Sequence, residues 1–482
     1  MQMRDESFDA VACDNRLDLF NCTLICFLLQ VSYDNTKPLT IAIITDAHID
    51  PLYEPYGVAD CAEPTCCRKG QTRRNNKYRT QYSPPAGYWG DYRNCDTPLW
   101  AYDDVIDRIH TTHKDIDIIY YMGDTIDHHI WATTYESIND MNQYLVNKLR
   151  TTFGDNVPVI ATIGNHEAQP TNQFAPERIT QEKLNTTWLY KGLAEKWGFY
   201  LTEEAQTSLR RRGDFSIVVR PGLRVISLNN NVAYKNNWWV VFDPLDAKNH
   251  LDWLIEELYK AEQAGEKVHI LTHIPPGVHD LVNPWTREYN KIVNRFYKTI
   301  AAEFNGHSHV DEFNIFYSIE NKTVPIAVSW GGGSATAYTD HNLNYKIAEI
   351  DPNSYSPLNI NNYIYNLTEA NLTPNRPPHW FQLYDLKNAY GLKDLSPNSM
   401  NELVYSMATD KKHLLDTYSA FHSKLSDRIW PYCSDDCKID NLCRIVVTVL
   451  FDREKSDANT LSSSRPSSYS LTCFLAIAVF AP

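Results

Sequence analysis

The sequence predicts an α/β fold, and three observations support this prediction. Short apolar runs rich in Ile, Val and Tyr recur along the chain, which is typical of buried strands. Amphipathic helical patterns lie between these runs, and such alternation predicts parallel or mixed sheets covered by helices. A short motif of acidic, amide or histidine residues follows each of five runs, and in α/β folds ligands bind at the carboxyl ends of the strands.

The predicted strands and ligand motifs alternate in a regular order. The first four runs are 40–45, 117–122, 157–163 and 268–272. The five motifs are Asp46-Ala47-His48, Gly123-Asp124, Gly164-Asn165-His166-Glu167, Thr272-His273 and Gly306-His307-Ser308-His309. A single Asp-x-His occurs often by chance, but five such loops in sequence, each behind a strand, do not.

Helical patterns complete the α/β prediction. Residues 246–264 place Leu251, Leu254, Ile255 and Leu258 on one face, and Gly265 should end that helix. From about residue 353 the composition shifts to Asn, Pro and Tyr, followed by helical patterns at 400–407 and 411–422. We therefore expect an N-terminal segment over 1–38, a catalytic α/β domain over 39–352, a small helical C-terminal subdomain over 353–445 and a divergent tail over 446–482.

The charge and the two ends of the chain limit its partners and location. A net charge of −14 argues against nucleic acid, whose phosphates need a basic surface. The apolar run 19–29 has the length of a signal h-region but starts late, behind acidic residues. The Ser-rich stretch 456–470 and apolar run 471–480 fit either a GPI-attachment signal or a divergent tail.

The five motifs supply the ligands of a two-metal centre. Two divalent cations about 3.5–4 Å apart can activate water and neutralise phosphoryl charge, which is what phosphoester hydrolysis requires. The first shell would contain Asp46, His48 and His309, the second would contain Asn165, His273 and His307, and Asp124 would bridge them. Nitrogen and oxygen donors without cysteine favour two zinc ions, with manganese or iron as alternatives.

Further motifs make a more specific resemblance. They are Asp60–Gly70, Gly87–Tyr92, Cys95-Asp96, His273–Gly277, Gly306–Phe313, Pro378–Trp380 and Tyr390–Leu392. Together with the ligand motifs they resemble the acid sphingomyelinase family of calcineurin-like metallophosphoesterases, from about Thr40 to Cys443. This resemblance implies a two-sheet α/β/β/α sandwich and a lysosomal or secreted zinc enzyme that cleaves sphingomyelin to ceramide and phosphocholine. It also implies peripheral contact with a lipid surface.

The resemblance assigns roles to individual residues. His128 corresponds to the family's general acid, and His166 to a histidine that stabilises the phosphoryl group or protonates the leaving oxygen. His129 stands where the family has an aspartate, which leaves the pKa of His128 open. Tyr345 matches an aromatic near the head group and could hold choline by cation–π attraction, or be a core tyrosine. Trp238, Trp239 and Trp285 are either lipid contacts or core residues.

The cysteines and glycosylation sequons are typical of an exported protein. By resemblance, the disulfides are Cys61–Cys66, Cys67–Cys95 and Cys433–Cys437. Ala233 and His279 replace a further cysteine pair of the family, which suggests a lost disulfide. Acceptor sequons stand at Asn185, Asn321 and Asn366, and a weaker one, close to a proline, at Asn371.

Two other functions compete with the lipid enzyme. About forty residues precede the first motif, so we expect no complete saposin domain of the kind that presents lipid in the family. That expectation favours the related acid sphingomyelinase-like phosphodiesterases, which act on soluble nucleotides or other phosphoesters. A non-catalytic secreted binding protein is the third alternative, although all seven ligand positions are filled. The sequence predicts no oligomeric state.

Overall fold

The computed structural model describes residues 36–74, 83–409 and 411–449. Contacts divide the chain into Met1–Lys37 and Pro38–Pro482, and the fold below is that of the second unit. The apolar runs 19–29 and 471–480, on which the signal and anchor predictions rest, lie outside the described residues. Within the described ranges, no helix combines the length and the apolar character needed to cross a bilayer.

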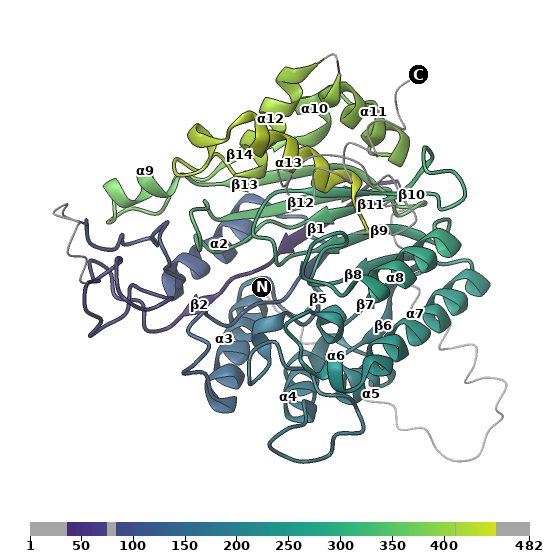
Figure 1. The fold of residues 1–482 in the computed structure, drawn as a ribbon, viewed down its shortest axis with the longest axis horizontal. Helices are drawn as coiled ribbons and strands as arrows, with labels where there is room; N and C mark the ends of the chain where they lie inside the picture. The colour runs from purple at the N-terminus through teal and green to yellow at the C-terminus, as the bar shows by residue number, and fades with distance from the viewer. Residues whose placement is uncertain (1–35, 75–82, 410, 450–482) are drawn as a thin grey trace, which may run out of the picture. The chain divides into compact units, whose positions relative to one another are not determined.

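Two six-stranded sheets form the centre of the fold (Figure 1). The first sheet has the order β14-β13-β12-β1-β4-β5, with β1, β4 and β5 parallel and the other neighbours antiparallel. Its strands are β1 (Leu39–Ile44), β4 (Ile118–Tyr121), β5 (Val159–Ala161), β12 (Asn344–Ile350), β13 (Pro357–Ile364) and β14 (Phe381–Asp385).

The second sheet has the order β10-β11-β9-β8-β7-β6, in which β7, β8, β9 and β11 are parallel. Its strands are β6 (Phe215–Arg220), β7 (Leu223–Ser227), β8 (Lys267–Leu271), β9 (Ile300–Asn305), β10 (Phe313–Tyr317) and β11 (Pro325–Gly331). Tyr120 of β4 contacts the rings of His269 and Phe304 in β8 and β9, so the two sheets pack against each other. A short parallel pair, β2 (Ile49–Asp50) and β3 (Thr97–Pro98), lies outside both sheets.

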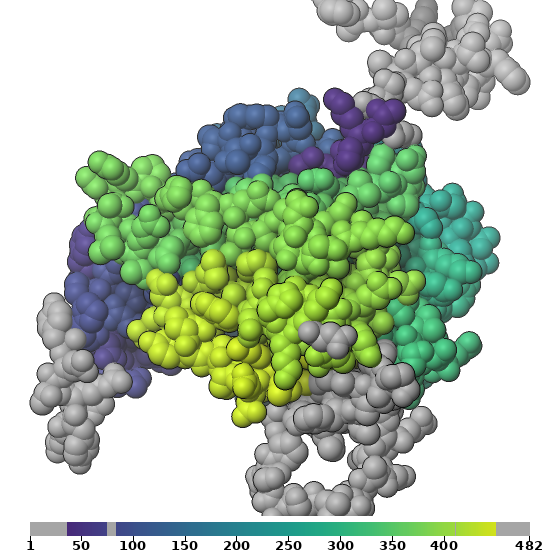
Figure 2. All heavy atoms as spheres, turned by 90° about the horizontal axis from the view of Figure 1, so that it is seen from above, coloured from purple at the N-terminus to yellow at the C-terminus, as the bar shows by residue number. Residues whose placement is uncertain are grey.

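Helices pack on the outer faces of the two sheets. Those of the α/β region are α2 (Leu99–Thr112), α3 (Tyr135–Phe153), α4 (Thr187–Trp197), α5 (Glu203–Arg212), α6 (Trp239–Phe242), α7 (Pro244–Ala264) and α8 (Asn283–Phe296). Those of the C-terminal region are α9 (Leu367–Leu372), α10 (Leu386–Tyr390), α11 (Pro397–Ala408), α12 (Lys412–His422) and α13 (Asp435–Val446). Single 3-10 turns are η1 (Asn165–Glu167), η2 (Gly198–Tyr200), η3 (Asn230–Ala233) and η4 (Trp430–Tyr432). Seen from above, the C-terminal residues, in yellow-green and yellow, gather on one face (Figure 2).

The predicted two-sheet α/β sandwich is confirmed. The predicted helix over 246–264 is α7, and Gly265 ends it in the left-handed conformation, with φ +70°. Strands β13 and β14 extend the first sheet beyond residue 352, into the region where the sequence predicts a helical subdomain. These strands were not predicted, since Asn is depleted in strands and β13 contains three. The C-terminal helices follow from Leu386 onward, apart from the short α9.

Candidate metal centre

The five ligand loops meet because each follows a parallel strand at the same edge of its sheet. β1, β4 and β5 lead to Asp46, Asp124 and Asn165, whereas β8 and β9 of the second sheet lead to His273 and His307. Since the two sheets pack face to face, these edges adjoin, and the loops of both sheets contribute to one cluster. All seven predicted ligands lie together in this cluster, and most of their side chains are buried.

Asp124 lies at the middle of the cluster. Its Oδ2 is 3.4 Å from Nε2 of His48 and 3.2 Å from Nε2 of His273. Burial opposes ionisation of this carboxyl, but the charges of His273 and His166 hold its pKa well below the usual range. One carboxylate that faces a histidine on either side has the geometry of a bridging ligand.

The other donors form a group on each side of Asp124. On one side, Nε2 of His309 lies 3.1 Å from Nε2 of His48 and 3.4 Å from Oδ1 of Asp46. On the other side, Oδ1 of Asn165 lies 3.0 Å from Nε2 of His273 and 2.9 Å from Nδ1 of His307. The donors assigned to each shell therefore lie near one another, and ring nitrogens of His128 and His166 lie close to the same group.

The chemistry of these donors fits bound cations. Nδ1 of His48, His273 and His309 donates to the backbone oxygens of Ile126, Met122 and Tyr338, at 2.7, 2.8 and 2.6 Å. When a cation is bound, each Nε2 would present its lone pair to it, and two such nitrogens stand 3.1 Å apart in His48 and His309. Lone pairs that converge in this way repel one another unless a cation lies between them.

The ligand loops adopt tight backbone conformations. Asp46, His48, Asp124, His307 and His309 all have positive φ, between 37° and 68°. Gly123 has φ +91°, and a β-carbon there would collide with the backbone nitrogen of Gly164 in the neighbouring ligand loop. The close approach of these two loops therefore requires glycine.

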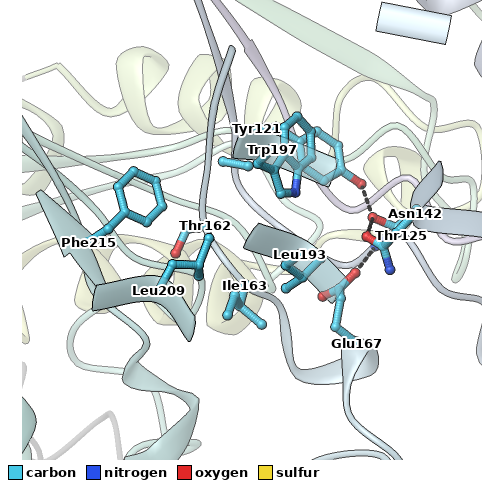
Figure 3. A pocket seen from close by; sticks show the side chains of 11 residues that line it. Tyr121, Thr125, Asn142, Thr162, Ile163, Glu167, Leu193, Trp197, Leu209 and Phe215 are labelled. Carbon is cyan, nitrogen blue, oxygen red and sulfur yellow. Dashed lines mark hydrogen bonds between the residues drawn. The ribbon is translucent and has the colours of Figure 1, made fainter. Parts of the chain in front are cut away.

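Glu167, the last residue of the third motif, joins two of these loops. Its Oε2 accepts hydrogen bonds from the backbone nitrogens of Gly164 at 2.7 Å and Asp124 at 3.1 Å. Its Oε1 accepts from the backbone nitrogen of Thr125 at 2.6 Å, and Thr125 in turn bonds Tyr121 (Figure 3). Burial raises the pKa of Glu167 to about 7. Glu167 thus positions the loop that carries Asp124.

His128 stands beside the cluster and is held on several sides. Its ring centroid is 4.0 Å from that of His48, and the ring of Tyr338 stacks on it at 3.8 Å. Its Nδ1 lies 2.6 Å from Oδ1 of Asp96, and its backbone nitrogen donates to Oδ2 of Asp96 at 2.7 Å. These contacts differ from those of a solvated loop histidine.

Asp96 provides His128 with a carboxylate partner, although His129 stands where the family has an aspartate. Burial and the charge of Asp127 raise the pKa of Asp96 to about 8, while burial and the nearby imidazoles of His166 and His309 lower that of His128. Oδ1 of Asp96 and Nδ1 of His128 are therefore placed to share one proton. His129 lies near Glu63, at 3.7 Å, and Trp131.

His166 also faces the cluster. Its backbone nitrogen donates to Oδ1 of Asp124 at 2.8 Å, which fixes the second oxygen of the bridging carboxylate. Its Nδ1 lies 3.2 Å from the backbone oxygen of Asp127, so the other ring nitrogen is available on the side of His48 and Asp124. The position suits contact with a phosphoryl group.

Three residues that contact the proposed site were not predicted from the sequence. Asp96 and Tyr338 contact His128, and Asp280 contacts His307, with Oδ2 3.2 Å from its Nε2. None of the three lies in a ligand motif. The acidic residue beside Cys95 was the available signal for Asp96, but nothing in the sequence pairs it with His128.

Tyr345 does not lie at an open surface. It is 0% exposed, its hydroxyl is 3.2 Å from Nε2 of His113, and its ring stacks on Tyr363 at 5.1 Å. Trp380 packs nearby at 5.2 Å. A ring covered in this way offers no free face to a trimethylammonium group, so the structure favours the alternative of a core tyrosine. Trp285 is also buried, and its indole stacks on Tyr289.

The three predicted disulfides are present, as Cys61–Cys66, Cys67–Cys95 and Cys433–Cys437. The segments of Ala233 and His279 are joined by backbone hydrogen bonds instead of a disulfide. Lys235 donates to Asp280 at 2.7 Å, and the nitrogen of Val282 donates to Ala233 at 3.0 Å.

The predicted glycosylation sites differ in their surroundings. Asn321 is exposed in the loop between β10 and β11. Asn185 and Asn366 are half-buried, and Nδ2 of each donates a hydrogen bond, to the backbone oxygen of Gln181 and to Asp427. Nδ2 of Asn371 donates to the backbone of Gly90. Asn321 is therefore the site whose surroundings suit a glycan best.

Comparisons with known proteins agree with this geometry. Residues 39–311 match the calcineurin-like phosphoesterase family, and residues 333–454 match the acid sphingomyelin phosphodiesterase C-terminal region. A human sphingomyelin phosphodiesterase is 37% identical over 84% of this chain and 62% of its own length. Sphingomyelin phosphodiesterase 1 of Caenorhabditis elegans is 33% identical over 85% and 70%. The chain thus spans less than two-thirds of the human relative.

A second group of relatives is more distant. Human acid sphingomyelinase-like phosphodiesterase 3b is 28% identical over 87% of this chain and 90% of its own length. A dimetal phosphatase of Danio rerio with a solved structure aligns at 11% identity and a TM-score of 0.38, over 72% of this chain and 100% of its own. A similarity of that size carries no further structural argument.

Proposed function

Because the chain belongs to the acid sphingomyelinase family of calcineurin-like metallophosphoesterases, we propose that it is a zinc-dependent phosphodiesterase that hydrolyses sphingomyelin to ceramide and phosphocholine. The observation that carries the proposal is the convergence of the seven predicted ligands beside the Asp96–His128 pair. Such a centre suits hydrolysis of a phosphoester whose leaving group must be protonated.

Separate residues would bind the metals and protonate the leaving group. One zinc would be held by Asp46, His48 and His309, and the other would be held by Asn165, His273 and His307. Asp124 would bind both. When bound, the two cations would lower the pKa of a water molecule and offset negative charge on the phosphoryl oxygens. The backbone carbonyls behind His48, His273 and His309 keep each Nε2 directed at its cation.

Protonation of the ceramide oxygen falls to His128. Nε2 of His128 gives its proton to the leaving oxygen as the P–O bond breaks, and Nδ1 takes the proton shared with Asp96. The imidazole is then neutral, Asp96 is a carboxylate, and no buried cation is left behind. His166, whose ring lies 4.6 Å from that of His128, would donate to a phosphoryl oxygen in the transition state.

Two alternatives remain as competing proposals. The first is an acid sphingomyelinase-like phosphodiesterase that acts on a soluble nucleotide or other phosphoester; the chain is similar to acid sphingomyelinase-like phosphodiesterase 3b, but at lower identity than to the sphingomyelin phosphodiesterases. A non-catalytic secreted binder has less support, because all seven donors are retained and converge.

The cellular location is inferred from the same family membership. We propose that the protein is secreted or lysosomal, with Asn321 as its most accessible glycosylation site; three disulfides between described cysteines support an oxidising compartment. GPI attachment stays a prediction from the tail sequence.

The deciding experiment compares three substrates at acidic pH, with and without added zinc. They are sphingomyelin in mixed micelles, bis-nitrophenyl phosphate and ATP. Release of phosphocholine supports the lipid enzyme. Cleavage of the soluble esters alone would favour the phosphodiesterase of soluble phosphoesters instead. Zinc-loaded protein that cleaves none of the three substrates would favour the non-catalytic binding protein.

A further inference from the structure

A short apolar protrusion stands next to the metal centre. Four side chains at the start of the α6–α7 segment are largely exposed: Trp238 at 77%, Val241 at 88%, Phe242 at 57% and Leu245 at 65%. We call these four residues the apolar tip. The stretch between Lys235 and Asp243 contains no charged residue. Exposed apolar residues gathered on one turn are uncommon on a soluble surface and mark an interaction site.

The base of the tip is fixed by buried hydrogen bonds. Asn237 is 1% exposed, its Nδ2 donates to the backbone oxygens of Phe174 and Val232 at 3.2 and 3.0 Å, and its Oδ1 accepts from Phe174. The backbone of Trp238 donates to Gln173. An anchored base with an exposed apolar end presents the tip outward, so its side chains do not fold back into the core.

Two short paths connect the tip to the metal ligands. Four residues before Trp238, the ring of Tyr234 contacts the ring of His307 at 5.6 Å. Next to Gln173, Oδ1 of Asn172 accepts a hydrogen bond from the ligand Asn165 at 2.8 Å. A surface that the tip touches is therefore held near the cluster where the substrate must react.

The charges around the tip are paired. Arg178 bonds Asp243 at 2.6 Å and lies over the ring of Phe242 at 4.7 Å, and Lys235 bonds Asp280 at 2.7 Å. Since these cations already have acidic partners, the surroundings carry little net charge. A partner without net charge fits this surface better than an anionic one.

We propose that the apolar tip inserts into a zwitterionic phospholipid surface and brings the metal centre to its substrate; this rests on the proposed function. Trp and Phe are the side chains that settle at the boundary between head groups and acyl chains. A second copy of the chain fits less well, because the four side chains expose roughly 500 Å², below the ~800 Å² per partner of stable interfaces.

The test measures vesicle binding separately from catalysis. The full-length protein is sedimented with phosphatidylcholine vesicles, as wild type and as a variant with Trp238→Ser and Val241→Ser. The matched control carries Leu372→Ser and Tyr432→Ser, two side chains of equal exposure, 78% and 79%. Leu372 ends α9, which lies at the far left of Figure 1, well away from α6. Melting temperatures establish that all three proteins are folded.

We expect wild type and control to bind alike, and the tip variant to need at least about tenfold more lipid. Its ratio of sphingomyelin to bis-nitrophenyl phosphate turnover should fall by a similar factor. Equal binding by all three proteins, or none by the wild type, overturns the proposal. Loss of self-association in the tip variant, with unchanged vesicle binding, would assign the tip to a second copy. If vesicle binding depends on the tip but sphingomyelin is not hydrolysed, the apolar tip is a lipid-binding surface and the proposed substrate is refuted.

Discussion

Replacing Asp96 by asparagine tests the proton path through His128. The substitution keeps the size of the side chain but removes the proton shared between Oδ1 and Nδ1, which lie 2.6 Å apart. A hydrogen bond to a charged group contributes about 1.5–3 kcal/mol, and each ~1.4 kcal/mol is a factor of ten in rate. Turnover of sphingomyelin should therefore fall about 10- to 150-fold.

The assay distinguishes proton transfer from simple structural damage. Ceramide leaves as an alkoxide and needs a proton, whereas nitrophenolate leaves readily without one. The Asp96→Asn variant should therefore lose much less activity on bis-nitrophenyl phosphate than on sphingomyelin. Zinc content, measured by mass spectrometry, should stay at the wild-type level, because Asp96 is not among the seven ligands.

A matched control exists elsewhere in the fold. Asp214 is also fully buried, and its Oδ2 forms an ion pair with Nδ1 of His250 at 2.6 Å, outside the metal cluster. Asp214→Asn should lower stability without changing the ratio of the two activities. An equal loss on both substrates in Asp96→Asn, or full activity on both, would refute the assignment of Asp96 and His128 to leaving-group protonation.

Four further outcomes are expected. Asp124→Asn should lose both bound zinc and turnover, while His128→Ala should lose turnover with zinc retained; equal zinc loss in the two would make His128 a ligand or structural residue. Gly123→Ala should lower the melting temperature and the zinc content, because its β-carbon meets the neighbouring ligand loop. Chelation should abolish activity, and zinc should restore it if the metal assignment is correct. Burial lowers the pKa of His250, but the nearby Asp214 outweighs this effect and raises that pKa above its usual value. The pair therefore stabilises the fold below pH ~6.5, and this contribution is lost as the pH rises through the raised pKa. Melting temperatures above that pH should fall more steeply for wild type than for Asp214→Asn, and parallel curves would contradict this.

The sequence predicted the parts of the site that depend on local pattern. Apolar runs that end in acidic or histidine motifs located β1, β4, β5 and β8, and the ligands follow these strands within a few residues. Helix α7 was predictable for the same reason, since its apolar spacing and its terminal glycine are both local.

The parts that depend on distant pairing were not predictable. Asp96 meets His128 across 32 positions, and Asp280 meets His307 across 27, and no spacing rule connects them. For Tyr345 the sequence left two alternatives open, a head-group contact and a core tyrosine, and the packing of β12 and β13, which buries the ring, favours the second. Asn-rich β13 was overlooked because pairing with β12 overrides its weak strand propensity.

The left-handed backbone at five metal ligands has a consequence for how the protein can change. A non-glycine residue in this region costs on the order of 1–2 kcal/mol, and Asp46, His48, Asp124, His307 and His309 all adopt it. Substitution by glycine at any of these positions would remove the local backbone cost but also remove a proposed ligand. The same mutation would therefore stabilise the fold and reduce activity. A chain released from catalysis would gain by losing these side chains. The presence of all five side chains in spite of this local cost is what we expect if the proposed metal centre is functional.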